Sequence, residues 1–212
     1  MFPSVYAIIT GNLVGGTALE WAERLSGAGV EIIQYRAKSV ASRDLYFACR
    51  ELAHLSRTHS FRFVVNDRPD IAALAGAGGV HVGQQDLDAE QARRICPSPC
   101  WVGVSTHTLE QVREADRTSA DYIAIGPIFP TKTKAEPDPV VGVDFVRQAR
   151  ALTRKPLVAI GGITVERAED VYLAGADSVA VASDLLASND PVRRVGEYLA
   201  IARRVIGKGQ RE

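Results

Sequence analysis

Short apolar runs rich in Val and Ile alternate with amphipathic stretches along the whole chain, and this alternation occurs eight times. Runs that are short and apolar throughout indicate strands buried on both faces, and the stretches between them indicate helices. Alternating strands and helices predict a parallel sheet with helices outside it. The expected strands span residues 5–9, 30–35, 61–65, 79–82, 101–105, 122–125, 157–160 and 178–181.

The boundaries of the expected helices carry their own signals. Thr17 and Glu20 have the spacing of a capping box, and Thr108 and Gln111 repeat it, so a helix should begin after each threonine. Glycines that precede the next strand supply left-handed ends for several helices. The last helix is expected over residues 191–205, followed by a polar tail at 207–212.

Two closures of such a sheet compete: an open doubly wound sheet and an eight-stranded barrel. Eight evenly spaced units favour the single (β/α)8 TIM barrel, although 212 residues is short for one. No Gly-x-Gly-x-x-Gly pattern follows the first strand, which weakens the open dinucleotide-binding alternative. Because no Pro/Ser-rich linker interrupts the pattern, we expect one catalytic domain over residues 1–206.

Composition excludes several classes of function. A formal net charge of zero without a basic tract argues against nucleic-acid binding. No apolar run approaches the ~18 residues that span a bilayer, and the N-terminus does not resemble a signal peptide. Three cysteines, an odd number, suggest reduced thiols and a cytoplasmic location. The oligomeric state is not fixed by the sequence, and a homodimer is one allowed assembly.

The second expected strand ends in an unusual polar group, Gln34-Tyr35-Arg36-Ala37-Lys38. Side chains at alternate strand positions share one face, so Gln34, Arg36 and Lys38 should project together. Arg grips oxyanions in a fork and Lys adds a point charge, which predicts a clamp for a phosphate-rich ligand. The alternative is a strand end that simply meets solvent.

Two aspartates follow neighbouring expected strands, at Asp67 and Asp86. Two carboxylates that face one cavity repel each other unless one is protonated or a cation bridges them. Magnesium commonly takes one or two protein carboxylates together with substrate phosphates, so the pair predicts a Mg²⁺ site beside the basic clamp. Alternatively, Asp67 caps the next helix or pairs with Arg68.

A second anion site is expected after strands seven and eight, where barrels commonly bind phosphate. Gly161 and Gly162 would let backbone N–H groups approach an anion closely, and Ser183 occupies the equivalent place after strand eight. Two phosphate sites in one cavity indicate an enzyme that joins or splits two phosphorylated small molecules.

The long loop after strand six carries polar side chains that could close over both ligands as an ordered lid, or could be a solvated charged loop. These side chains are Thr131, Thr133 and Lys134. Two histidines lie near the expected site. His81 is interpreted as a satisfied core residue, and His107 at the rim as the better candidate for a proton carrier.

Taken together, these motifs resemble those of thiamine-phosphate synthases (thiamine-phosphate pyrophosphorylases) over essentially the whole chain. The resemblance is carried by Gln34-Tyr-Arg-Ala-Lys38, Asn66-Asp-Arg68, Val80-His-Val-Gly-Gln84 with Asp86, Gly103-Val-Ser-Thr-His107, Gly126-Pro-Ile-Phe-Pro-Thr-Lys-Thr-Lys134, Ile160-Gly-Gly-Ile163 and Ala182-Ser183. It implies a barrel that condenses a pyrimidine diphosphate with a thiazole phosphate, giving thiamine phosphate and pyrophosphate.

The resemblance also implies a role for each matched residue. Mg²⁺ would be bound by Asp67 and Asp86. The pyrimidine diphosphate would be held by Gln34, Arg36, Lys38, Asn66, Ser105 and Lys134, of which Arg36, Lys38, Ser105 and Lys134 would assist catalysis. The thiazole phosphate would be held by Thr131, Thr133, Gly162, Ala182 and Ser183.

Two other functions stay open at this point. A thiazole tautomerase would share the monophosphate cradle and move a proton instead, and His107 is compatible with it. A non-catalytic barrel that binds phosphorylated ligands for regulation would keep the cradle and lose the metal pair. The presence of both carboxylates and of the basic clamp favours the synthase.

Overall fold

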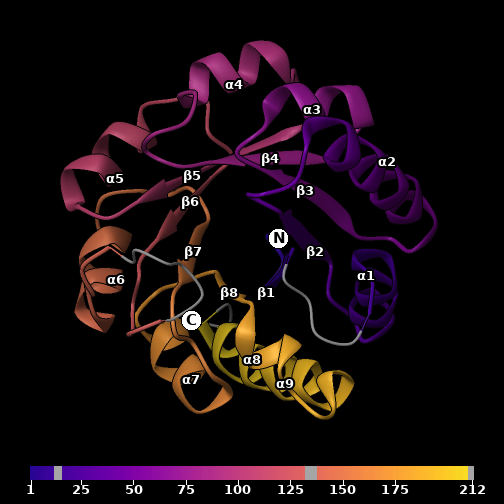
Figure 1. Ribbon diagram of the computed structural model, residues 1–212. Helices are drawn as coiled ribbons and strands as arrows, with labels where there is room; N and C mark the ends of the chain where they lie inside the picture. Colours follow the sequence, from indigo (N-terminus) through magenta and orange to yellow (C-terminus); the bar gives the residue numbers. More distant parts are fainter. Residues whose placement is uncertain (12–15, 132–137, 210–212) are drawn as a thin grey trace.

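The computed structural model describes residues 1–11, 16–131 and 138–209, and it forms a closed barrel of eight parallel strands in the order β1 to β8. The (β/α)8 barrel predicted from the sequence is therefore confirmed (Figure 1). The strands are β1 Val5–Thr10, β2 Ile32–Arg36, β3 Arg62–Asn66, β4 Gly79–Val82, β5 Trp101–Thr106, β6 Tyr122–Ile125, β7 Leu157–Ile160 and β8 Ser178–Val181.

Helices surround the strands in a ring (Figure 1). They are α1 Ala18–Gly27, α2 Ser42–Thr58, α3 Pro69–Ala75, α4 Ala89–Ile95, α5 Leu109–Asp116, α6 Val143–Arg150, α7 Val165–Leu173, α8 Ser183–Leu186 and α9 Pro191–Gly209. None of the helices in the described ranges is both long and apolar enough to cross a membrane.

Both predicted capping boxes form. Thr17 Oγ1 accepts the backbone N–H of Glu20 at 3.2 Å, while the Glu20 carboxylate accepts that of Thr17 at 2.7 Å. Thr108 and Gln111 make the same reciprocal pair at the start of α5. Several boundaries differ from expectation, most of them by one residue. Strand β2 begins at Ile32 rather than at residue 30, and α9 continues to Gly209.

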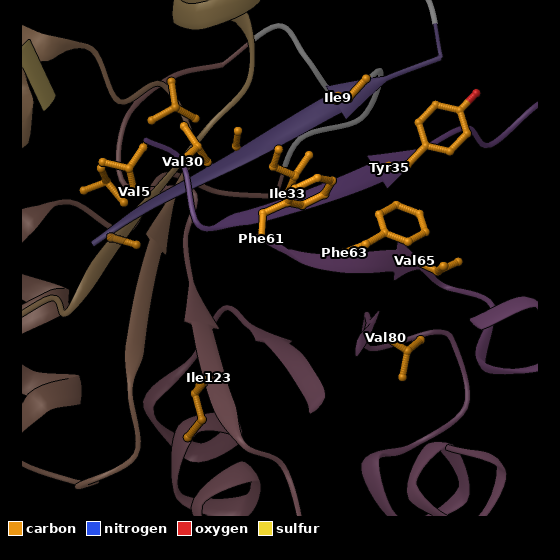
Figure 2. Close-up of a cluster of buried hydrophobic side chains, with 14 of the residues drawn as sticks. Val5, Ile9, Val30, Ile33, Tyr35, Phe61, Phe63, Val65, Val80 and Ile123 are labelled. Atoms are coloured by element: carbon orange, nitrogen blue, oxygen red, sulfur yellow. The ribbon is translucent and has the colours of Figure 1, made fainter. Parts of the chain in front are cut away.

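Strand alternation divides the apolar residues into two layers. Residues such as Ile9, Ile33, Phe63 and Val80 point outward and pack against the helices, in the cluster drawn in Figure 2. Their neighbours point into the lumen, which contains Tyr6, Ile8, Ile32, Val64, Tyr122, Ala124, Val158 and Ala180. Both faces of each strand are thus buried, which explains why the runs are apolar throughout.

The lower part of the lumen is filled by aromatic rings. Phe2 lies against Trp101 and Tyr122, with ring centroids 5.2 Å apart in each pair. The N-terminus accordingly lies near the barrel axis in Figure 1. Gly103 makes room for the Tyr122 ring, because a Cβ at Gly103 would lie 2.0 Å from Tyr122 Cζ. The barrel is therefore a packed core, and chemistry is confined to its carboxyl-end rim.

Candidate active site

The polar end of β2 lies at this rim. Gln34 and Arg36 occupy alternate positions of β2, on the face that points into the lumen. The strand ends at Arg36, so Lys38 stands in the following turn rather than on the strand as expected. The turn nevertheless brings Lys38 Nζ to 3.1 Å from Asp67 Oδ2. The clamp and the first carboxylate are thus adjacent.

Asp67 has an unusual backbone conformation and does not cap the next helix. Its φ of +62° is left-handed, a region that Asp tolerates better than most residues. The helix cap is Arg68, whose guanidinium binds the Asp70 carboxylate at 2.8 and 2.6 Å. The alternative reading of Asp67, as a helix cap or a partner of Arg68, is wrong.

Asp86 approaches Asp67 from the loop after β4. Its Oδ2 accepts the backbone N–H of Gly83 at 2.8 Å. Partial removal from water raises the pKa of Asp86, and the nearby Asp67 carboxyl raises it further, although the Gly83 hydrogen bond and Lys38 oppose the shift. The part of this shift that comes from Asp67 indicates that the two carboxyls lie close together.

The donor set fits a magnesium ion. In the described part of the chain no group of three or more His, Cys, Asp or Glu side chains could form a closed metal cage. Two carboxylates without further protein ligands suit a hard cation that keeps water and substrate phosphate oxygens in its coordination sphere. The expected pair, Asp67 and Asp86, is the set that the fold brings together.

The guanidinium of Arg36 is available for a ligand. Within residues 1–11, 16–131 and 138–209 it has neither a hydrogen-bond partner nor an ion-pair partner, although the residue is half-buried. An anion is the natural partner of such a fork. Asn66, the last residue of β3, lies on the lumen face beside it. Lys134 and Thr133, also expected here, lie outside the described residues.

The segment after β6 is held against the turn after β7. Ile128 N donates to Ile160 O at 2.9 Å, and Phe129 N donates to Gly161 O at 3.0 Å. A Cβ at Gly162 would lie 2.3 Å from Pro130 O. The space beside its Cα is filled by the neighbouring loop, which leads directly to Thr131, so the packing here requires glycine. The expected role of the Gly162 backbone N–H in binding an anion stays a prediction.

Arg167, on α7, contacts both the turn after β7 and the segment after β6. Its guanidinium donates to Gly162 O at 2.8 Å and stacks over the Phe129 ring at 4.7 Å. The expected phosphate residues of β8 lie next to this turn, because β7 pairs with β8. Ser183 is the first residue of α8, and Ala182 precedes it on the lumen face.

Ser105 belongs to a hydrogen-bonded group that sequence reasoning missed. His81 Nε2 lies 2.8 Å from Ser105 Oγ, and His81 Nδ1 lies 3.1 Å from the Tyr122 hydroxyl. Burial lowers the pKa of His81 to about 4, so its ring is neutral at pH 7. This agrees with the interpretation of His81 as a satisfied core residue. The missed signal was a tyrosine at a lumen-facing strand position, where its hydroxyl needs a partner.

Both ring nitrogens of His107 face protein groups, which makes it a poorer candidate for a proton carrier than the sequence suggested. Its Nδ1 lies 2.6 Å from Gly126 O, and its Nε2 lies 3.5 Å from Asp138 Oδ2. A carbonyl oxygen can only accept, so Nδ1 carries a hydrogen and is engaged. His107 therefore ties the end of β5 to both sides of the segment after β6.

A cavity of about 600 Å³ opens at the other end of the barrel. It is lined by residues that precede β1 and β2, among them Phe2, Ser4 and Glu31. The carboxylate pair and the clamp follow the strands instead, so this cavity is separate from the candidate site.

Similar known proteins share one description. A family model described as thiamine monophosphate synthase matches residues 5–185. A thiamine-phosphate synthase of Koribacter versatilis is 47% identical over 204 residues, covering 94% of this chain and 95% of the relative. One of Archaeoglobus fulgidus is 38% identical over 201 residues, covering 95% and 94%.

Similar barrels occur among solved structures. A thiamine phosphate pyrophosphorylase from Pyrococcus furiosus superposes with a TM-score of 0.86 at 31% identity, covering 96% of each chain. A 3-hexulose-6-phosphate synthase from Salmonella typhimurium has a TM-score of 0.72 at 17% identity, with 95% of this chain and 99% of that chain covered. The latter likeness shows the fold alone.

Replacing Gly162 with alanine should destabilise the chain through the loop contact. The new Cβ would press on Pro130 O and on Phe129, in addition to the strain of a side chain at a φ of +59°. Overpacking commonly costs about 1–3 kcal/mol. Gly142 is the matched control, because its φ is +77° and a Cβ there would meet nothing within 4 Å. Urea unfolding should show a larger loss for Gly162→Ala than for Gly142→Ala; equal losses would contradict the contact.

Replacing Asp86 with asparagine should stabilise the chain in the absence of metal. Because folding raises the pKa of Asp86, ionising Asp86 favours unfolding, and stability falls as the pH rises through the folded-state pKa. Asp86→Asn removes that charge. Calorimetry in a chelator should show a higher unfolding temperature than wild type at pH 8, and the difference should shrink toward the unfolded Asp pKa of about 3.9. A variant less stable than wild type at every pH would contradict the repulsion.

Proposed function

The chain belongs to the thiamine monophosphate synthase family, and from this membership we propose that it condenses 4-amino-2-methyl-5-(diphosphooxymethyl)pyrimidine with a thiazole phosphate. The products are thiamine phosphate and pyrophosphate, and the enzyme is a transferase of thiamine biosynthesis. The observation that carries the proposal is the rim itself, where two carboxylates, Lys38 and the guanidinium of Arg36 lie together; Arg36 has no partner among the described residues.

The proposed metal site uses Asp67 and Asp86. Mg²⁺ bound by these carboxylates and by diphosphate oxygens would offset the negative charge of the leaving group. Lys38 already lies beside Asp67, so the diphosphate would enter a site where cations face it from two sides. The metal ion and the clamp would then both bind the diphosphate, as is needed to assist its departure as pyrophosphate.

The reaction needs one bond broken and one bond formed. The C–O bond between the pyrimidine methylene and the diphosphate breaks, and the electron pair leaves with pyrophosphate. The resulting pyrimidine cation accepts the lone pair of the thiazole nitrogen, forming the C–N bond. No protein nucleophile is required, so the enzyme acts by positioning both rings and stabilising the leaving charge.

Each predicted site residue has a place in this scheme. Arg36, Lys38 and Lys134 oppose the charge that develops on pyrophosphate, and the Ser105 hydroxyl donates to the same substrate. The other contacts to the pyrimidine diphosphate are proposed for Gln34 and Asn66. The thiazole phosphate is proposed to bind Gly162, Ala182 and Ser183 of the turns that follow β7 and β8, together with Thr131 and Thr133.

The competing functions lose support from the same geometry. A tautomerase would use a free rim histidine, whereas both ring nitrogens of His107 face protein groups. A regulatory barrel would have no use for a paired carboxylate site beside a cationic clamp. A cytoplasmic location and a homodimer stay predictions.

The decisive experiment is to mix the purified chain with both substrates and to follow pyrophosphate and thiamine phosphate. We expect both products to form in equal amounts with Mg²⁺ and neither to form with a chelator. Asp86→Asn should lose most turnover while remaining folded. Isomerisation of a thiazole without pyrophosphate release would favour the tautomerase. Full turnover in chelator would remove the metal from the proposal.

Changing Arg36 should weaken the leaving-group step specifically. Arg36→Ala should lower kcat/KM for the pyrimidine diphosphate by about 10²- to 10³-fold, as for other preorganised charge donors. Arg36→Lys should recover part of this loss, because the charge returns without the fork. Arg43→Ala, on the outward helix α2, is the control and should match wild type in the pyrophosphate assay. Wild-type rates for Arg36→Ala would mean that the clamp is not catalytic.

A further inference from the structure

Five side chains from five strands form one hydrogen-bonded chain across the barrel lumen. Gln34 Nε2 donates to the Tyr6 hydroxyl at 2.8 Å, and the Tyr6 and Tyr122 hydroxyls are 2.9 Å apart. The Tyr122 hydroxyl lies 3.1 Å from His81 Nδ1, and His81 Nε2 lies 2.8 Å from Ser105 Oγ. The two ends of this lumen chain, Gln34 and Ser105, are both proposed contacts for the pyrimidine substrate.

The middle of the lumen chain is sealed from water. Tyr6 is 2% exposed and Tyr122 is fully buried, with Phe2 packed beneath the Tyr122 ring. The His81 and Tyr122 rings also stack, with centroids 5.5 Å apart. Burial raises the pKa of Tyr6 and of Tyr122, so both phenols keep their hydrogens. Every hydrogen in the lumen chain must therefore find its acceptor within the chain or at its ends.

Counting hydrogens gives the lumen chain a direction. Each hydroxyl carries one hydrogen, and a neutral imidazole carries one N–H. Since Gln34 donates to Tyr6, the Tyr6 hydrogen goes to its other neighbour, Tyr122. Tyr122 then donates to Nδ1 of His81, which places the imidazole hydrogen on Nε2. Nε2–H donates to Ser105 Oγ, and the hydrogen of Ser105 points out of the chain.

With the Gln34 amide placed so that Nε2 faces the Tyr6 hydroxyl, the reverse order does not satisfy the same groups. If Nδ1 of His81 carried the hydrogen, Tyr122 would accept from it and donate to Tyr6. Tyr6 would then accept from both Gln34 and Tyr122, and its own buried hydrogen would have no acceptor among its described neighbours. An unpaired buried donor is unfavourable, so the first order is the stable one.

We propose that Tyr6, Tyr122 and His81 are positioning residues for the pyrimidine half of the active site. They fix the Ser105 hydroxyl as a hydrogen-bond donor toward the ligand. They also fix the Gln34 amide, whose carbonyl oxygen is left to accept. An aminopyrimidine diphosphate offers amino hydrogens and acceptor oxygens, so a fixed donor and a fixed acceptor complement it. This inference rests on the proposed function for the identity of the ligand.

The first test reads the hydrogen positions directly in the ligand-free chain. Long-range ¹H–¹⁵N correlation spectra of protein labelled in its four histidines report which ring nitrogen of each carries the hydrogen, and His81→Gln identifies the His81 signals. We expect the Nε2–H form of His81 in wild type at pH 7.5, and a changed tautomer ratio in Tyr122→Phe. An Nδ1–H form in wild type would overturn the proposed direction.

The second test is kinetic and separates positioning from stability. Tyr122→Phe removes one hydroxyl from the lumen chain and should lower kcat/KM for the pyrimidine diphosphate by about 10- to 100-fold, as for other supporting partners of a site residue. KM for the thiazole phosphate should stay within about twofold. Tyr172→Phe is the matched control, because it removes a phenol that bonds Ser4 O at 2.8 Å outside the lumen chain.

The outcomes distinguish the possible explanations. Tyr122→Phe in a Ser105→Ala background should add little further loss if Tyr122 acts through Ser105. Equal kinetic effects of Tyr122→Phe and Tyr172→Phe would overturn the positioning role. If wild type forms no thiamine phosphate, the proposed function fails, while the tautomer measurement still decides the direction of the lumen chain.

Discussion

Closure of the parallel barrel is the constraint on which the rest of the structure depends. Each strand residue must face either the lumen or the helices, and all eight strands deliver their carboxyl ends to one rim. In β2, Ile33 and Tyr35 therefore pack outward, while Ile32 and Gln34 enter the lumen. The same alternation places Arg36 at the rim beside the end of β3. The site is assembled from residues far apart in sequence because closure leaves their strands no other arrangement.

Close backbone approach then fixes the loops at that rim. Between the segment after β6 and the turn after β7, two hydrogen bonds and the contact of Gly162 with Pro130 leave no room for a side chain. Arg167 adds a guanidinium that bonds Gly162 and covers Phe129. The loop that carries Thr131 is therefore attached to the turn that carries Gly162, so two segments proposed to bind the thiazole phosphate are in direct contact. Neither segment can be displaced without disturbing the other.

The sequence predicted the strands and the rim well, because periodicity and strand ends are local properties. It predicted less well what depends on distance across the fold. Lys38 reaches Asp67 through a turn that strand alternation does not describe. Tyr6 and Tyr122 read as apolar strand residues, yet their hydroxyls meet across 116 positions of sequence. The close contact of Gly162 with Pro130 depends on a neighbouring loop that the glycine alone does not reveal. In each case the determining partner lies in another part of the chain.

Charge and neutrality are distributed unequally between rim and lumen. The rim holds Lys38, Asp67, Asp86 and Arg36, while the lumen chain below consists of neutral groups that burial keeps neutral. A charged group buried in the lumen would act on a charged intermediate from the side opposite the rim. It would thereby reduce the difference in charge between the rim and the lumen. With neutral groups there, the charged side chains of the proposed site all lie at the rim. In the proposed reaction, Lys38 and Arg36 would stabilise the charge on the departing pyrophosphate, while neutral hydrogen bonds from Ser105 and to Gln34 would hold the pyrimidine ring in place.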